Sequence, residues 1–281
     1  MALAEVATKR TGMDAQDYYN ELQGLKQRPL SDDWLEAAIM LAHIARIRPS
    51  KTISNLARLR GSHARRDAVV QFDRFEAMLQ EYLAPLTLTN HGYHEHSFAS
   101  TDHGPVWIQV DAHMRSLRRA GYETFLNSGT LLGVVRDNRL IDHDDDIDLA
   151  IILNATSAEE AAREWKSLKS LLVGLDLYEG EVRDMPGVYK LRPAGQIEID
   201  LFPAWIEGDR AFVYPHTSGG LPVEAVVPLQ PCALTGQAIP ARPEQMLAEN
   251  YGPDWHSPDP FFKFPWAAAN KRFAPFLERL A

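Results

Sequence analysis

The sequence predicts an α/β (α+β) fold, in which helices flank a small mixed sheet and a helical extension precedes it. Apolar residues recur at intervals of three and four through most of the first third of the chain, as on helices that lie on a core. Short apolar runs at 147–153 and 196–202 have the length and alternation of strands. Hydrophobic residues make up 45% of the 281 residues, which is enough for a core. We expect the helical extension at residues 1–104 and the sheet-containing domain at 105–281.

The extension is predicted from two periodic segments. Ser31 is a suitable N-cap for a helix over 34–44, which we expect Pro49 to close. A second helix is predicted over about 64–83. Between them lies a basic stretch, Lys51 to Arg66, which is either a solvated helical face or a docking site for an anionic acceptor or a lipid headgroup.

Composition restricts the partners. The net charge of −9 argues against a broad grip on nucleic acid, which needs clustered Lys and Arg. Cys232 is the one cysteine, so neither an intrachain disulfide nor a cysteine zinc site can form. Met1 to Gly12 lacks the apolar run of a signal peptide, and no segment approaches the ~20 apolar residues of a membrane span. We expect a cytoplasmic protein, and contact with the inner face of the membrane stays open.

The histidine-rich segment 85–105 is predicted to be a loop or short hairpin. His91, His94 and His96 have no cysteine and no helical spacing, so we do not expect a metal there. The rest of the predicted elements follow in chain order: a helix at 106–120, a strand at 122–126, a short helix at 129–136, a strand at 147–153, a helix at 158–172, strands at 188–191 and 196–202, and short helices at 243–250 and near the C-terminus.

Asp146 and Asp148 stand where the apolar strand at 147–153 begins. Successive side chains of a strand alternate between faces, so the two carboxylates point the same way while Ile147 and Leu149 point into the core. Two carboxylates on one face repel each other, and a hard cation between them makes the arrangement favourable. Mg²⁺ or Mn²⁺ suits such oxygen ligands. The alternative is a solvated acidic loop.

Asp200 extends this reasoning to a second strand. The segment 196–202 alternates, which puts Glu198 and Asp200 on one face and the isoleucines on the other. A carboxylate between Ile199 and Leu201 on a central strand is costly without a partner. A third metal ligand, or a base for an incoming hydroxyl, explains it, and a structural salt bridge is the alternative. Glu198 is a weaker candidate because it lies nearer the start of the strand.

Ser128-Gly129-Thr130 joins a predicted strand to a predicted helix. Free N–H groups and the helix dipole attract anions at such a junction, and Gly129 leaves room for a phosphate to approach the backbone. Capping of the helix by Ser128 or Thr130 is the alternative. Arg136, about two helical turns on, could contact phosphate or pair with the acids. Lys190, on the strand next to the last acid, could also contact phosphate.

Part of the chain resembles the LicD/fukutin family of the nucleotidyltransferase superfamily. The resemblance covers about residues 106–260 and rests on four segments: 129–136, 144–148, 199–202 and the tail element 239–255. Two positions depart from the family pattern. His143 replaces a Trp before the acidic run, and Arg139-Leu140 replaces an aromatic residue or a Gly-Phe pair.

The resemblance implies a nucleotidyltransferase-like catalytic domain at 105–281. It also implies transfer of a phospho-substituted group, phosphocholine or polyol phosphate, from a CDP-linked donor to a hydroxyl of a glycan or glycolipid in cell-surface polysaccharide or glycoconjugate synthesis. The residues alone support only metal-assisted phosphoryl-type transfer, with Asp146, Asp148 and Asp200 on the metal. Two alternatives stay open: a nucleotidyltransferase that releases pyrophosphate and leaves a nucleoside monophosphate on a small molecule or protein, and a non-catalytic binding module.

Overall fold

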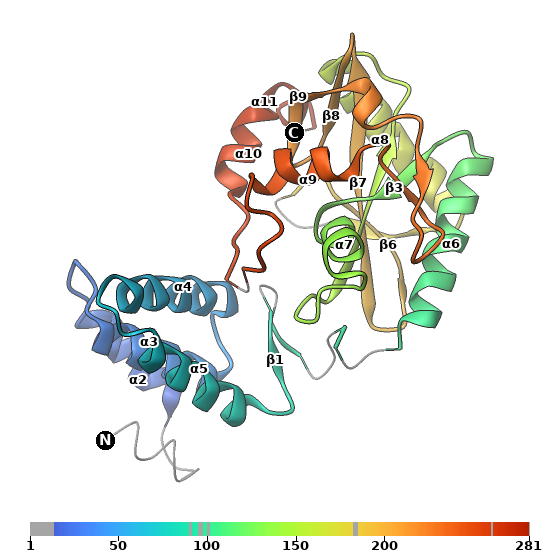
Figure 1. Ribbon diagram of the computed structural model, residues 1–281. Coiled ribbons are helices and arrows are strands. Elements are labelled where there is room, and N and C mark those ends of the chain that lie inside the picture. The colour runs from blue at the N-terminus through green and yellow to red at the C-terminus, as the bar shows by residue number, and fades with distance from the viewer. Residues whose placement is uncertain are drawn as a thin grey trace. The chain divides into compact units, whose positions relative to one another are not determined.

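The computed structural model describes residues 14–89, 92–94, 98–99, 102–181, 185–259 and 261–280. Met1–Gly12, His91 and His96, which entered the sequence predictions, lie outside these ranges. The chain divides into two compact units. The helical unit ends at Ser97 but includes the later segment Asp259–Lys263, and the sheet unit holds Phe98–Pro258 and the residues from Phe264 onward. Figure 1 labels the elements of each unit.

The helical unit contains four described helices, followed by a small antiparallel hairpin. Their bounds are α2 Ala15–Gly24, α3 Asp32–Ala45, α4 Pro49–Arg65, α5 Val69–Leu83, β1 Thr87–Leu88 and β2 Tyr93–His94. The basic stretch is thus itself a helix, and the expectation that Pro49 closes the preceding helix is wrong. Arg46, at φ 53°, ends α3, and Pro49 occupies the first turn of α4, where its missing N–H costs nothing.

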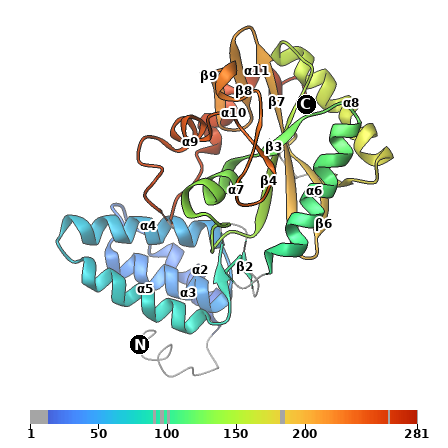
Figure 2. The same ribbon diagram turned by 45° about the vertical axis from the view of Figure 1, so that its right-hand side comes forward.

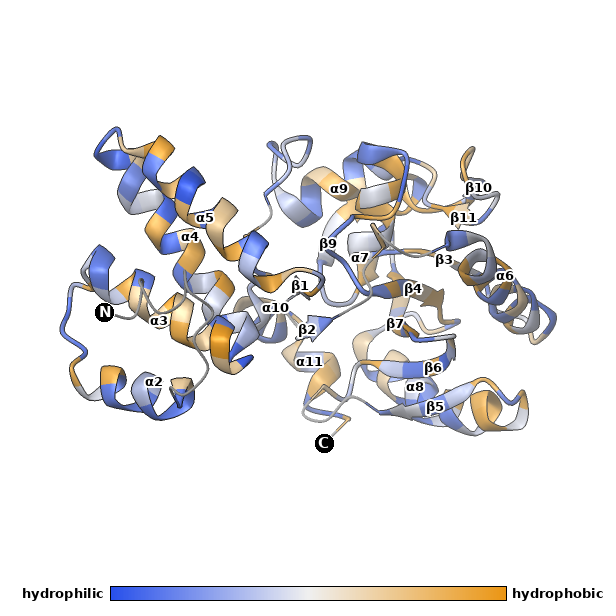
Figure 3. Ribbon diagram, turned by 90° about the horizontal axis from the view of Figure 1, so that it is seen from below, coloured by the Kyte–Doolittle hydropathy of each residue, from blue (hydrophilic) through white to orange (hydrophobic). Residues whose placement is uncertain are grey.

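The core of the helical unit forms where the apolar stripes of its helices meet. Ile39 of α3 and Leu59 of α4 are fully buried, and Phe72 of α5 is almost so. Phe261 joins from the distant segment, with its ring 5.8 Å from that of Phe72 in an edge-to-face arrangement. Figure 3 shows hydrophilic and hydrophobic residues alternating along α4 and α5, the pattern of helices with one buried face.

The described strands of the sheet unit form one seven-stranded mixed sheet and a separate two-stranded pair. The sheet order is β3-β4-β7-β6-β5, with β8 pairing β7 and β9 pairing β8; β4 and β7 run parallel, and the other pairs are antiparallel. The strands are β3 Thr124–Leu126, β4 Asp146–Ile152, β5 Tyr178–Glu181, β6 Tyr189–Ala194, β7 Ile197–Glu207, β8 Arg210–Val213, β9 Thr217–Pro222, β10 Gln230–Pro231 and β11 Ala238–Ile239. The predicted mixed sheet flanked by helices is confirmed.

Helices pack on the sheet and on one another in the sheet unit. They are α6 His103–Arg119, α7 Ser128–Leu132, the π-turn η1 Gly133–Asp137, α8 Ala158–Gly174, the 3₁₀ turn η2 Val223–Ala225, α9 Pro243–Tyr251, α10 Trp266–Arg272 and α11 Ala274–Leu277. Figure 2 shows α6 beside β6, and α8 at the upper right of the view. Trp205 of β7 stacks on Phe212 of β8 at 5.2 Å and on Phe276 of α11 at 5.3 Å, so the chain end closes the core. None of the helices described has the length and apolar character of a membrane span.

Candidate active site

The predicted acids lie on the two parallel strands at the centre of the sheet. Asp148 of β4 is in register with Asp200 of β7, and Asp146 is in register with Glu198. Paired residues of neighbouring strands share a face, as do residues two apart on one strand. All four carboxylates therefore lie on one face of the sheet. Asp146, Asp148 and Asp200 are each 8% exposed.

The carboxylates around Asp146 raise its proton affinity. The pKa of Asp146 lies well above its ordinary value, first because of burial and then because of nearby carboxylates, those of Asp148, Asp144, Asp200 and Asp145. A divalent cation among these oxygens would reverse the repulsion, and oxygen donors are the ligands that Mg²⁺ and Mn²⁺ accept. The residues present therefore fit such an ion.

The described carboxylates that lie closest together are not the three predicted metal ligands. Within the described ranges, one group of three offers oxygens within 4.8 Å of one another, and it consists of Asp144, Asp145 and Asp146. Asp148 accepts a hydrogen bond from the Gly129 amide, and Asp200 forms an ion pair with the Lys190 ammonium. These contacts orient the two carboxylates. We give more weight to the strand acids, because Asp144 and Asp145 are only half-buried in the loop before β4.

The turn that precedes α7 contacts the acids directly. The Gly129 amide donates to Asp148 Oδ2 at 3.0 Å, and the Asp148 amide donates to the Thr130 hydroxyl at 2.9 Å. A Cβ on Gly129 would lie 2.7 Å from Asp144 Oδ2. Glycine therefore leaves room here for the Asp144 carboxylate, which a side chain at this position would displace. From the sequence, glycine was instead expected to leave room for a phosphate. The Gly129 amide, which was expected to bind that phosphate, donates to the Asp148 carboxylate.

Neither Ser128 nor Thr130 caps α7. The N-cap is Asn127, whose side chain makes no capping hydrogen bond. Ser128 adopts φ 42°, a left-handed conformation that non-glycine residues rarely take, and its side chain is buried. The Ser128 hydroxyl and both side-chain polar atoms of Asn127 have no hydrogen-bond partner among the described residues. Buried polar atoms of this kind are rare in folded proteins and indicate a ligand or ordered water.

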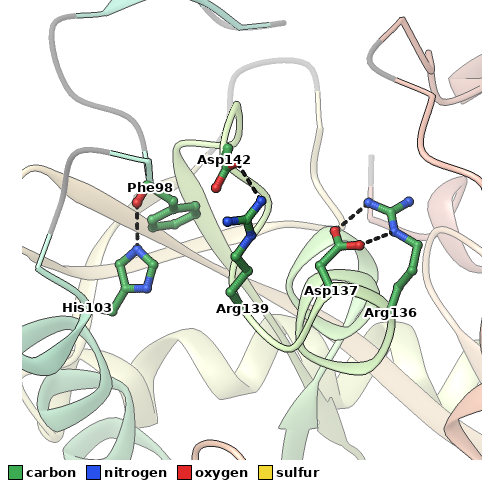
Figure 4. Close-up of polar contacts among 6 residues, drawn as sticks. All are labelled: Phe98, His103, Arg136, Asp137, Arg139 and Asp142. Carbon is green, nitrogen blue, oxygen red and sulfur yellow. Dashed lines mark hydrogen bonds and ion pairs between the residues drawn. The ribbon is translucent and has the colours of Figure 1, made fainter.

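Arg136 lies on η1, a short π-turn of a kind that often marks functional sites. Its side chain is only 10% exposed, and its guanidinium holds Asp137 in a bidentate pair, with Nε–Oδ1 at 2.8 Å and Nη2–Oδ2 at 2.7 Å. Figure 4 shows the Arg136 guanidinium turned toward the Asp137 carboxylate. The guanidinium thus pairs with an acid outside the predicted cluster.

The acidic loop before β4 is itself anchored. The Phe98 amide donates to the Asp144 carbonyl at 3.3 Å, and the Ala99 amide donates to the Asp142 carbonyl at 3.2 Å. Asp142 also pairs with Arg139 at 2.8 Å (Figure 4). These contacts tie the loop to the backbone at Phe98 and Ala99 and to Arg139.

Lys190 of β6 extends the row of charges across the sheet. It is in register with Asp200, and its ammonium lies 2.8 Å from Asp200 Oδ1 and also contacts Glu198. Burial opposes the charge on Lys190, but the carboxylates of Asp200 and Glu198 outweigh it and raise its pKa. The structural salt bridge that was the alternative for Asp200 is thus present, and Lys190 contacts the acids.

Tyr251, at the end of α9, is a site residue that the sequence reasoning missed. Burial raises its pKa well above the ordinary value, and the charges of Asp148, Asp144 and Asp146 raise it further, although Arg136 opposes them. The phenol therefore lies near the acids, although it is more than a hundred residues from them in the chain. The Tyr-Gly-Pro-Asp-Trp element at 251–255 was the available signal.

Comparison with known proteins assigns the domain. No curated protein matches the chain. The family model described as LicD/FKTN/FKRP, nucleotidyltransferase domain, matches residues 121–242, a range that holds β3, the Gly129 turn, the acidic loop and the strands of all three predicted ligands. Residues 121–242 are thus similar to the nucleotidyltransferase domain of the LicD/FKTN/FKRP family.

Proposed function

We propose that the chain is a divalent-metal-dependent transferase that moves phosphocholine or a polyol phosphate from a CDP-linked donor to a hydroxyl of a glycan or glycolipid. The observation that carries this proposal is the buried row of Asp146, Asp148 and Asp200 on neighbouring parallel strands. The family is one of transferases, which supports group transfer as the reaction class.

Asp146, Asp148 and Asp200 would hold Mg²⁺ or Mn²⁺. When bound, the ion would offset the carboxylate repulsion and polarise the phosphates of the donor. The raised pKa of Asp146 supports this assignment, because a fold that gathers like charges needs a compensating partner.

In the transfer step, the acceptor oxygen forms a bond to the phosphorus of the moving group, and the bond from that phosphorus to CMP breaks. Asp200 accepts the proton of the acceptor hydroxyl, while Lys190, 2.8 Å away, holds its carboxylate in place. Asp146 and Asp148 lie on the neighbouring strand and would face the donor.

The groups around the turn at Gly129 would position the donor. The Ser128 hydroxyl is buried and has no partner in the described chain, so it is available to a phosphate oxygen. Thr130 holds the backbone of Asp148, and the Gly129 amide holds its carboxylate. Arg136, fixed in orientation by Asp137, would supply positive charge to the phosphates.

The name of the matched domain favours one second candidate, a nucleotidyltransferase that leaves a nucleoside monophosphate on its acceptor. The same residues would serve it, but pyrophosphate would leave instead of CMP. We place either reaction in the cytoplasm, which suits a chain whose one cysteine, Cys232, is free.

The test is incubation of the protein with a panel of CDP-linked donors and of nucleoside triphosphates, each with Mg²⁺ and a glycan acceptor mixture. CMP release that requires both metal and acceptor supports the proposal. Pyrophosphate release supports the second candidate. Asp148→Asn is the matched inactive control, because it removes charge and preserves shape. Neither product with any donor would contradict both.

A further inference from the structure

Five cations gather around one face of α4 in the helical unit, and we call them the basic patch: Lys26, Arg28, Lys51, Arg58 and Lys263. Lys51 and Arg58 are about two helical turns apart and therefore share a face of α4. Lys263 reaches the same face, because its ammonium donates to the hydroxyls of Ser50 at 2.8 Å and Ser54 at 3.3 Å.

The patch members are close enough to repel one another. Burial lowers the pKa of Lys51, and the charges of the other four members lower it further. Arg28, Arg58 and Lys263 are exposed, and Lys26 and Lys51 are half-buried. An anion in this position would relieve the repulsion.

Two acids of the helical unit pair with cations outside the patch. Asp259 contacts Arg60 at 2.6 Å, and Asp32 contacts Arg66, just after α4. α4 itself contains no Asp or Glu. Across the residues that the structure describes, no patch member forms an ion pair. The patch is thus a local positive field on a chain of net charge −9.

Large apolar side chains adjoin the patch in the chain. Leu25 precedes Lys26 and is 72% exposed, and Phe262 precedes Lys263 and is 38% exposed. Exposed apolar side chains would contribute nothing to the binding of a soluble phosphate. Cations mixed with apolar groups that can enter the interface are what an anionic lipid surface recruits.

We propose that the basic patch docks the helical unit onto a membrane surface rich in anionic lipid. The cations would contact lipid phosphates, and Leu25 and Phe262 would enter the interface. The docking uses none of the acids of the sheet unit, so it does not depend on the proposed reaction.

The test is co-sedimentation of the full chain with vesicles of phosphatidylcholine alone and of phosphatidylcholine mixed with phosphatidylglycerol. Binding to the anionic vesicles only, weakened by high salt, is expected. The triple variant Lys51→Gln, Arg58→Gln and Lys263→Gln should lose binding on the order of 100-fold, since each cation near such a surface contributes a factor of about five. The matched control neutralises three exposed cations of α6, Arg115, Arg118 and Arg119, and should bind as the parent does.

A second variant separates lipid from soluble phosphate. Leu25→Ser should weaken vesicle binding roughly tenfold, whereas Val173→Ser, at an exposed position on α8, should not. Equal binding to neutral vesicles, an unchanged triple variant, or displacement by pyrophosphate with no effect of Leu25→Ser would each overturn the proposal. Thermal unfolding of every variant should match the parent, because the altered side chains lie at the surface.

Discussion

Two sets of carboxylates, one in each unit, have opposite electrostatic surroundings. In the helical unit, Asp32 lies 3.1 Å from His63 Nε2 and also contacts Arg66, so a partly buried acid faces a guanidinium and an imidazole. In the sheet unit, Asp146 and Asp148 lie on β4 beside Asp200, and the pKa of Asp146 is raised by burial and by its acidic neighbours. The first arrangement stabilises a fold, and the second opposes it. An acid cluster that the fold itself does not need is the better guide to chemistry.

The largest expected effect comes from removing one strand acid. Asp146→Asn should lower turnover by roughly 10³-fold or more, because a ligand to the ion is lost. The same variant should unfold at a higher temperature than the parent when no metal is present, because one repelling charge is gone. Turnover assays and thermal scans with and without Mg²⁺ measure both effects.

The control is Asp142→Asn, in the loop before β4, whose side chain is 48% exposed and paired with Arg139. Asp142→Asn should change neither the turnover nor the unfolding temperature by much. A lower unfolding temperature for metal-free Asp146→Asn would mean that the acid supports the fold, as Asp32 does.

Asp200 should behave differently from the β4 acids. Asp200→Asn should lower turnover by roughly 10²–10³-fold but leave donor binding almost unchanged, because Asp146 and Asp148 remain to hold the ion on the donor. Calorimetry with Mg²⁺ and the donor, beside turnover, separates these roles. Loss of donor binding as complete as in Asp146→Asn would place all three acids in a single undivided cage.

A smaller effect concerns a buried histidine of the helical unit. Burial lowers the pKa of His43 from 6.5 to about 4, although its hydrogen bond with the Ile39 carbonyl opposes this. The unfolded chain therefore binds the proton first as pH falls. The free energy of unfolding should decrease between pH 6.5 and about 4 by a total of about 3 kcal/mol from this group.

Urea unfolding across that pH range measures the slope, with amide exchange of α3 as the local probe. His43→Gln should flatten the part of the slope that belongs to this group. An identical pH dependence in parent and variant would show that His43 titrates alike in both states.

The smallest expected effect comes from the exposed partner of Asp32. Arg66→Ala should lower the free energy of unfolding by at most about 0.5 kcal/mol, because its side chain is 58% exposed and water screens the pair. Arg65→Ala, one residue earlier and exposed, is the matched control. A loss several times larger would mean that the pairing of acids in the helical unit contributes more to its stability than surface pairs usually do.

Much of the acid row was predictable because a strand alternates. The spacing of Asp146 and Asp148 places both on one face whatever the neighbouring strands are. The register of Asp148 with Asp200 was not predictable, since strand order is a tertiary property. The bidentate ion pair between Arg136 and Asp137 was also not predictable from the sequence, because a π-turn rotates side chains away from their α-helical positions.

Among the elements that the sequence analysis did not delimit, β9 and α4 illustrate two different reasons. The strand β9 contains Gly219 and Gly220 and ends in Pro222, so its composition is that of a loop, and only pairing with β8 makes it a strand. The helix α4 does have an amphipathic pattern in the sequence. Its buried residues Ile53, Leu56 and Leu59 recur every three positions, but cations lie between them and mask this periodicity.

The helical unit is discontinuous in the chain, since Asp259–Lys263 returns to it after the sheet unit has been passed through. Phe261 packs on Phe72 and lies under the Arg60 guanidinium, whose other contact is Asp259. During synthesis this unit therefore lacks a core residue until the intervening part of the sheet unit has been made. Truncation at Ser97 would likewise leave Phe261 without its partner. A gene fragment that encodes the sheet unit alone should therefore omit the return segment and join its flanks with a short linker.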